Sequence, residues 1–78
     1  MDVSDMLLAS VSLHRSAATA KSESKLELWR HAYEMRKRAH AEDPEHLSPG
    51  WAAEQGATPR GRDTHEELMT FYREKLGE

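Results

Sequence analysis

An uninterrupted helical segment in the middle of the sequence constrains the fold most. Residues 24–42 contain no Gly or Pro, and they stop just before Pro44, which cannot continue a helix. At their start, Ser24 stands three residues before Glu27. This is the spacing of a capping box, in which each side chain accepts a hydrogen bond from a backbone N–H group at the helix start. The sequence therefore predicts a helix over 25–42 that is capped by Ser24.

Apolar residues of this segment recur at helical spacing and predict the face that it buries. Leu26, Trp29 and Tyr33 are three or four positions apart, so they share one side of a helix. Three further apolar residues border this side, namely Leu28, Ala32 and Met35. We expect the remaining elements to pack around this face.

Length and composition limit the chain to one small all-α domain. The 78 residues are enough for a single domain over 1–78. No Ile is present, and Val3 and Val11 are the only valines, so little strand-forming material is available. The absence of Cys excludes disulfides and thiolate zinc sites. A core of this size rarely supplies more than about 3–5 kcal/mol, and self-association is one usual supplement.

Two arrangements are open for the first half of the chain. Residues 4–20 predict a first helix, which Asp2 or Ser4 can cap. The polar stretch over 19–23 allows a turn that would make the first two helices antiparallel neighbours, although it holds no residue that must break a helix. One continuous helix from 4 to 42 is the alternative. The capping box at Ser24 favours the hairpin.

The C-terminal half predicts a short helix and a long one. Pro49 follows a Ser that can cap a helix, and Gly56 can end one, so we expect a helix over 49–55. Residues 57–62 predict an open loop, and a last helix is expected over 64–76. The architecture predicted is therefore a helical hairpin plus a C-terminal helix, with a short fourth helix in the connecting region.

Several function classes find little support in the sequence. No apolar run approaches the length of about 20 residues that crosses a bilayer, and the longest, 6–9, is too short for a signal-peptide core, so we expect a cytoplasmic protein without membrane contact. No nucleophile motif or phosphate-binding glycine loop occurs, which predicts a protein that is not an enzyme and needs no cofactor. His40 and His46 flank an acidic stretch, but their spacing matches no established metal site, and no metal is predicted.

Charge is segregated along the chain and indicates a binding function. Residues 25–40 carry five Lys or Arg against two Glu, whereas residues 41–59 carry four acidic residues and no Lys or Arg. Such segregation is typical of protein–protein contact, including pairing between two copies. We therefore expect a small protein-binding module that self-associates as a homodimer or acts as an adaptor or inhibitor of a larger protein. Candidate contact residues are Trp51, Arg30, Arg36, Lys37, Arg38, Arg60 and Arg62.

Nucleic-acid binding is the second hypothesis, because a basic helix face can also meet phosphates. The net charge of −3 for the whole chain argues against it. A solvated helix face is the commoner meaning of such a charge run. No helix-turn-helix glycine turn between two well-formed helices is evident either.

The C-terminal half resembles small accessory proteins of actinobacterial phages and their GC-rich hosts. The resemblance is carried by the runs Asp43-Pro44-Glu45-His46, Ser48-Pro49-Gly50-Trp51-Ala52 and Thr64-His65-Glu66-Glu67-Leu68-Met69-Thr70-Phe71-Tyr72-Arg73. It implies a small factor that binds and redirects a host protein in the host cytoplasm. Such proteins also include DNA-binding regulators, so the resemblance does not separate the two hypotheses, and it supplies no catalytic or binding residues.

Overall fold

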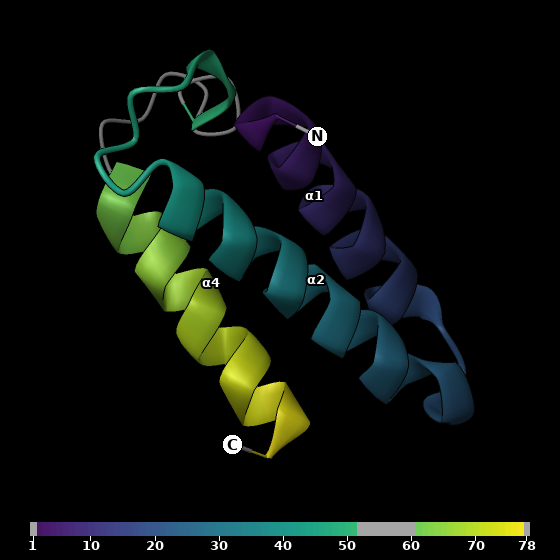
Figure 1. The fold of residues 1–78 in the computed structure, drawn as a ribbon. Coiled ribbons are helices and arrows are strands. Elements are labelled where there is room, and N and C mark those ends of the chain that lie inside the picture. The colour runs from purple at the N-terminus through teal and green to yellow at the C-terminus, as the bar shows by residue number, and fades with distance from the viewer. Residues whose placement is uncertain (1, 52–60, 78) are drawn as a thin grey trace.

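Three long helices make up most of the chain. The computed structural model describes residues 2–51 and 61–77, and within them lie α1 (Val3–Thr19), α2 (Ser22–Glu42) and α4 (Gly61–Leu76) (Figure 1). No strand occurs among the described residues. The prediction of an all-α fold is therefore confirmed.

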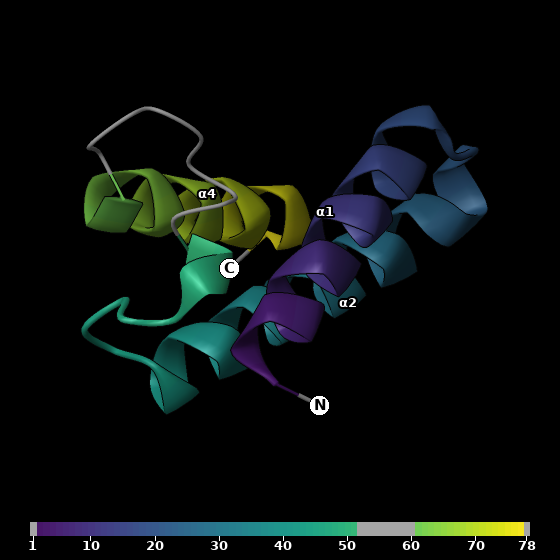
Figure 2. The same cartoon turned by 90° about the horizontal axis from the view of Figure 1, so that it is seen from above.

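Helix α2 is the central element. Both α1 and α4 pack against it, whereas no Cα atom of α1 comes within 8 Å of one in α4 among the described residues. Seen from above, α1 and α4 lie on the same side of α2 (Figure 2). The opposite side of α2, here called its outward face, is lined by exposed residues throughout its length, among them Glu27, Glu34 and Ala41.

The first two helices form an antiparallel hairpin, which is the arrangement that the sequence analysis favoured. Ala20 and Lys21 both adopt extended backbone angles (φ −74°, ψ 157°). Two extended residues in succession end the hydrogen-bond ladder of α1 and let the chain reverse. The alternative of one helix from 4 to 42 is thereby excluded.

The predicted capping box at Ser24 is wrong, because α2 begins at Ser22, three residues earlier than predicted. Lys21 occupies the N-cap position, and its side chain makes no capping hydrogen bond. Its carbonyl oxygen instead accepts from the backbone N–H groups of Ser24 and Lys25, at 3.1 and 3.2 Å. Backbone hydrogen bonds thus start the helix at Ser22, and Ser24 lies inside the first turn, where it cannot serve as a cap. Asp2 does cap α1, since its carboxylate accepts from the N–H of Asp5 at 2.8 Å.

Asp43 shapes the turn that follows α2. Its backbone N–H donates to the carbonyl of Ala39, and its carboxylate accepts from the N–H groups of Leu47 and Ser48 at 3.0 and 2.6 Å. Desolvation acts to raise the pKa of Asp43, but these two hydrogen bonds, the Trp51 side chain and the charge of His46 outweigh it and lower that pKa. The carboxylate therefore holds residues 43–48 in a closed turn that redirects the chain toward α1.

A helical turn begins at residues 49–51 and rests on the start of α1. A Cβ atom placed on Gly50 would lie 2.6 Å from the Cα atom of Ser4, so only Gly allows this approach. The prediction of a helix over 49–55 is confirmed for 49–51, and its remainder lies outside the described residues.

The core consists of two clusters at opposite ends of the hairpin. Met6, Leu7, Ala39 and Trp51 form the first, with Val3 against it. The second surrounds four buried residues, Ala17, Trp29, Ala32 and Tyr72, with Leu13, Leu28, Tyr33, Leu68, Phe71 and Leu76 packed around them. Trp29 is buried as predicted, but Leu26 is 58 % exposed, so its predicted burial is wrong.

Helix α4 begins earlier than the sequence predicted. It starts at Gly61 instead of residue 64, so the predicted loop over 57–62 is wrong for residues 61 and 62, and residues 57–60 lie outside the described part of the chain. Among the residues that the structure does describe, no helix is long and apolar enough to span a membrane.

Candidate binding surface

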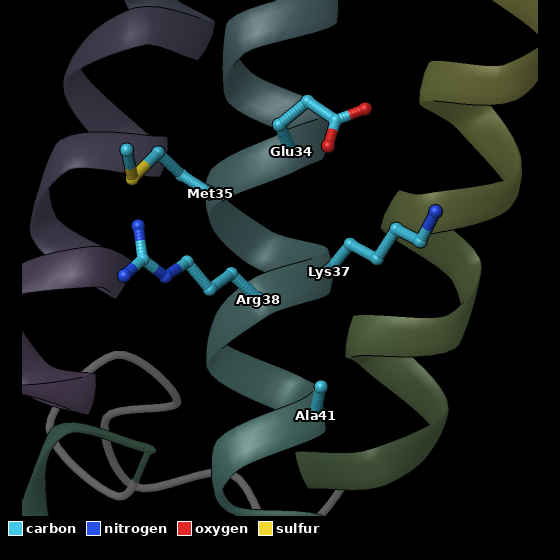
Figure 3. A pocket seen from close by; sticks show the side chains of 5 residues that line it. All are labelled: Glu34, Met35, Lys37, Arg38 and Ala41. Carbon is cyan, nitrogen blue, oxygen red and sulfur yellow. The ribbon is translucent and has the colours of Figure 1, made fainter.

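The outward face of α2 contains an open hollow of about 360 Å³. Its walls come from one helix only and are formed by Glu34, Met35, Lys37, Arg38 and Ala41 (Figure 3). The side chain of Lys37 extends toward α4, and those of Met35 and Arg38 extend toward α1 (Figure 3). The two basic side chains therefore border the hollow on opposite sides and leave its centre open.

Four of these residues have the spacing of a helix-packing hole. Glu34, Lys37, Arg38 and Ala41 stand at positions i, i+3, i+4 and i+7. In packed helix pairs, a side chain of one helix inserts into the space between four residues at this spacing on the other. The small Ala41 side chain keeps the hole open at one end. This surface can accept an apolar side chain from a second helix.

Neighbouring residues contact the two basic side chains. The Lys37 ammonium lies 5.7 Å from the ring centre of Tyr33, within cation–π range. The Arg38 Nε atom lies 3.9 Å from Glu42 Oε1, one helical turn further on. Both side chains remain exposed to solvent, so these contacts orient them without covering them.

Two residues predicted to contact a partner are buried instead. Trp51 is only 2 % exposed because its ring fills the first core cluster beside Met6 and Leu7. Arg36 is only 1 % exposed, since its position on α2 faces the packed side between Ala32 and Ala39. Neither side chain is available at the surface in this structure, and the predicted basic face loses Arg36.

The other predicted contact residues divide into exposed and undescribed ones. Arg30, Lys37 and Arg38 are exposed on α2. Arg60 and the side chain of Arg62 lie outside what the structure describes. The predicted contact surface is thus reduced, among described residues, to part of one helix.

Large apolar residues at the surface were largely missed by the sequence interpretation. Leu8, Leu26 and Leu47 are 68, 58 and 77 % exposed. The sequence pattern placed Leu26 in the core. Counting from Trp29 and Ala32, which are buried, Leu26 lies beside the exposed side of α2, and this spacing was the signal that could have identified it.

A second hollow, of about 210 Å³, opens between the helices. It is lined by Val11, His14, Arg15, Arg36, Leu68 and Tyr72. The Nδ1 atom of His14 lies 2.7 Å from the Tyr72 hydroxyl, and the His14 ring makes an edge contact with Trp29 at 5.0 Å between centroids. Partial burial, followed by the charge of Arg36, lowers the pKa of His14. His14 is therefore a neutral, packed side chain at pH 7.

His40 and His46 approach one another beside Trp51. The ring centroids of the two histidines lie 5.1 Å apart, and that of His46 lies 4.2 Å from Trp51. No group of three or more His, Asp or Glu side chains within the described ranges comes together as a metal site would require. The arrangement is a ring cluster that covers the edge of Trp51.

Comparison of the chain with models of protein families, with curated proteins and with solved structures returned no match. The resemblance to phage accessory proteins thus stays a prediction.

Proposed function

We propose that the chain is a small protein-binding module that presents the outward face of α2 to a helix of a partner protein. The observation that carries this proposal is the hollow lined by Glu34, Lys37, Arg38 and Ala41 at the spacing of a helix-packing hole. No described element of the chain covers it. A helix is the element that supplies one side chain to such a hole and continues along the same face.

The charges of the outward face favour a partner that carries both signs. Glu27, Arg30, Glu34 and Lys37 are all exposed and alternate between acidic and basic along α2. A partner helix with the complementary alternation would be guided into one register, because like charges placed opposite each other oppose association. A uniformly charged partner would meet repulsion at every second position.

Nucleic-acid binding is the weaker alternative on this geometry. Arg36 is buried and Arg38 lies beside Glu42, so the exposed basic charge on α2 is smaller than the sequence count suggested. Glu27 and Glu34 lie on the same face and would repel phosphates. Mixed charge of this kind suits a protein partner better.

The role that we propose is that of an adaptor or inhibitor without catalytic residues, cofactor or metal. If the resemblance to phage proteins holds, the partner would be a host protein in the host cytoplasm. Whether or not the partner is a host protein, the contact is made by a few residues of one helix face.

Site-specific photocrosslinking tests the proposal. A photoreactive phenylalanine analogue is placed at position 38, on the border of the hole, and separately at Ser12, an exposed position on α1. We expect protein adducts from position 38 and few from position 12. Equal adduct yields at the two positions, or none at either, would contradict the assignment of the binding face to α2.

A further inference from the structure

We infer that the helix seated on the outward face of α2 is α2 of a second copy of this chain, packed antiparallel about a two-fold axis. This inference rests on the proposed function and names the partner. It depends on two independent features of α2, its order of charges and the position of Leu26 relative to the hole.

The charges of the outward face are complementary to themselves when one helix is reversed. At 100° per residue, Glu27, Arg30, Glu34 and Lys37 fall within an arc of about 80° on α2. An antiparallel pair with its axis level with residue 32 places Glu27 opposite Lys37 of the second copy and Arg30 opposite Glu34 of the second copy. Each contact occurs twice, as two-fold symmetry requires. A parallel pair in register would instead place each charged residue opposite the same residue of the second copy, so like charges would meet.

The same axis brings Leu26 to the hole. Reversal about residue 32 places Leu26 level with residue 38 of the second copy, between Lys37 and Ala41, which border the hollow. Leu26 is 58 % exposed in the single chain, and insertion would remove part of that apolar surface from water. The hole gains the apolar side chain that its spacing accommodates. Charge order and hole position thus give the same register independently.

The order of charges and the insertion of Leu26 contribute to pairing in different ways. Exposed ion pairs add little affinity, so Glu27 and Lys37 set orientation and register. The two symmetry-related Leu26 side chains contribute apolar area to the contact, because each is 58 % exposed in the single chain. A contact built from two leucines and a few charges is weak and therefore reversible with concentration.

Sedimentation equilibrium of charge-reversal variants tests the register. Glu27→Lys and Lys37→Glu each place like charges opposite each other, and we expect either to weaken dimer formation by about tenfold. The double variant Glu27→Lys/Lys37→Glu restores opposite signs at both contacts and keeps the net charge, so dimer formation returns toward that of the wild type. Glu45→Lys, an exposed change outside α2, is the matched control and leaves the affinity unchanged.

A comparison of Leu26→Ala with Leu47→Ala tests whether Leu26 enters the hole of the second copy. Both leucines are exposed, but only Leu26 lies on the paired face, so only its loss is expected to weaken the dimer, again by about tenfold. A wild-type chain that stays monomeric up to about 1 mM overturns the inference, as does a double charge variant that dimerises no better than the single ones. If the chain is monomeric while position 38 still crosslinks to a different protein, the self-pairing fails and the proposed function stands. If both fail, the outward face is not a binding surface.

Discussion

The side chains of His14 and Tyr72 join two helices whose backbones do not approach each other. His14 Nδ1 on α1 lies 2.7 Å from the Tyr72 hydroxyl on α4, across the second core cluster. The rings of Phe71 and Trp29 pack against His14 as well, at 5.8 and 5.0 Å between centroids. This contact fixes α1 and α4 on the same side of α2 and so leaves the opposite side of α2 exposed.

Replacing Tyr72 by Phe removes this hydrogen bond and keeps the ring. Because His14 is partly buried, its Nδ1 atom would lose its partner, and we expect the free energy of unfolding to fall by about 1–2 kcal/mol. Urea denaturation measures the change. Tyr33→Phe is the control, since Tyr33 is also partly buried but makes no hydrogen bond with His14. Equal losses in the two variants would show that the His14 contact adds nothing.

Stability is expected to depend on pH through His14. Its pKa in the folded chain is lowered from 6.5 by burial and by the charge of Arg36. The unfolded chain therefore binds a proton first as the pH falls, and proton binding to the unfolded state lowers the free energy of unfolding. The contribution of His14 is complete above about pH 6.5 and is lost progressively below it, until the folded-state pKa is reached.

A comparison with His14→Asn isolates this effect from the other histidines. Asn cannot take up a proton in this range, so the free energy of unfolding of the variant should change less between pH 7.5 and pH 5 than that of the wild type. Chemical denaturation at each pH gives both curves. Parallel curves for the two proteins would rule out His14 as the source.

Trp51 is expected to act on stability and not on binding directly. Because its ring is 2 % exposed within the first core cluster, Trp51→Ala should lower the free energy of unfolding by about 3–5 kcal/mol. Leu47→Ala, nearby but 77 % exposed, should change it by less than about 0.5 kcal/mol. Thermal unfolding of the two variants checks this order, and a larger loss for Leu47 would contradict the burial assigned to Trp51.

Gly50 is expected to resist replacement even by Ala. The added Cβ would meet the Cα atom of Ser4 at 2.6 Å, so the turn at 49–51 must move away from α1, at a cost of about 1–3 kcal/mol. Trimming Ser4 to Ala leaves its Cα in place and should not rescue the variant. Recovery of wild-type stability in Gly50→Ala/Ser4→Ala would show that the obstacle is the serine side chain alone.

The helical elements were predictable where local pattern determines them. The cap at Asp2 and the end of α2 before Pro44 follow from short-range chemistry, and both are present. The hairpin is present as well, but the capping box at Ser24 that favoured it is not formed. The start of α2 was predicted three residues late. Backbone hydrogen bonds to the Lys21 carbonyl start the helix, and such bonds leave no pattern of side-chain types in the sequence.

The proposed binding face was less predictable, because it depends on which way α2 is turned. Helical spacing groups Leu26 with Trp29, but packing of Ala32, Arg36 and Ala39 turns α2 so that Leu26 is exposed and Arg36 is buried. A buried Arg contradicts the usual rule that charged residues lie outside. Only the positions of α1 and α4 settle that orientation, and they arise from contacts distant in sequence such as His14 with Tyr72.

The distance between spin labels on two copies tests the central claim, that the outward face of α2 makes the contact, most directly. The chain has no Cys, so single labels can be attached through Glu23→Cys or Glu42→Cys, two exposed positions that do not line the hollow. Antiparallel pairing about residue 32 sets position 23 within one residue of the level of position 42 of the second copy, whereas two labels at position 42 are separated by about 30 Å along the helix axis. We predict a short distance in a mixture of the two labelled variants and a long one for Glu42→Cys alone. Equal distances in both samples, or no coupling between copies in either, would contradict it.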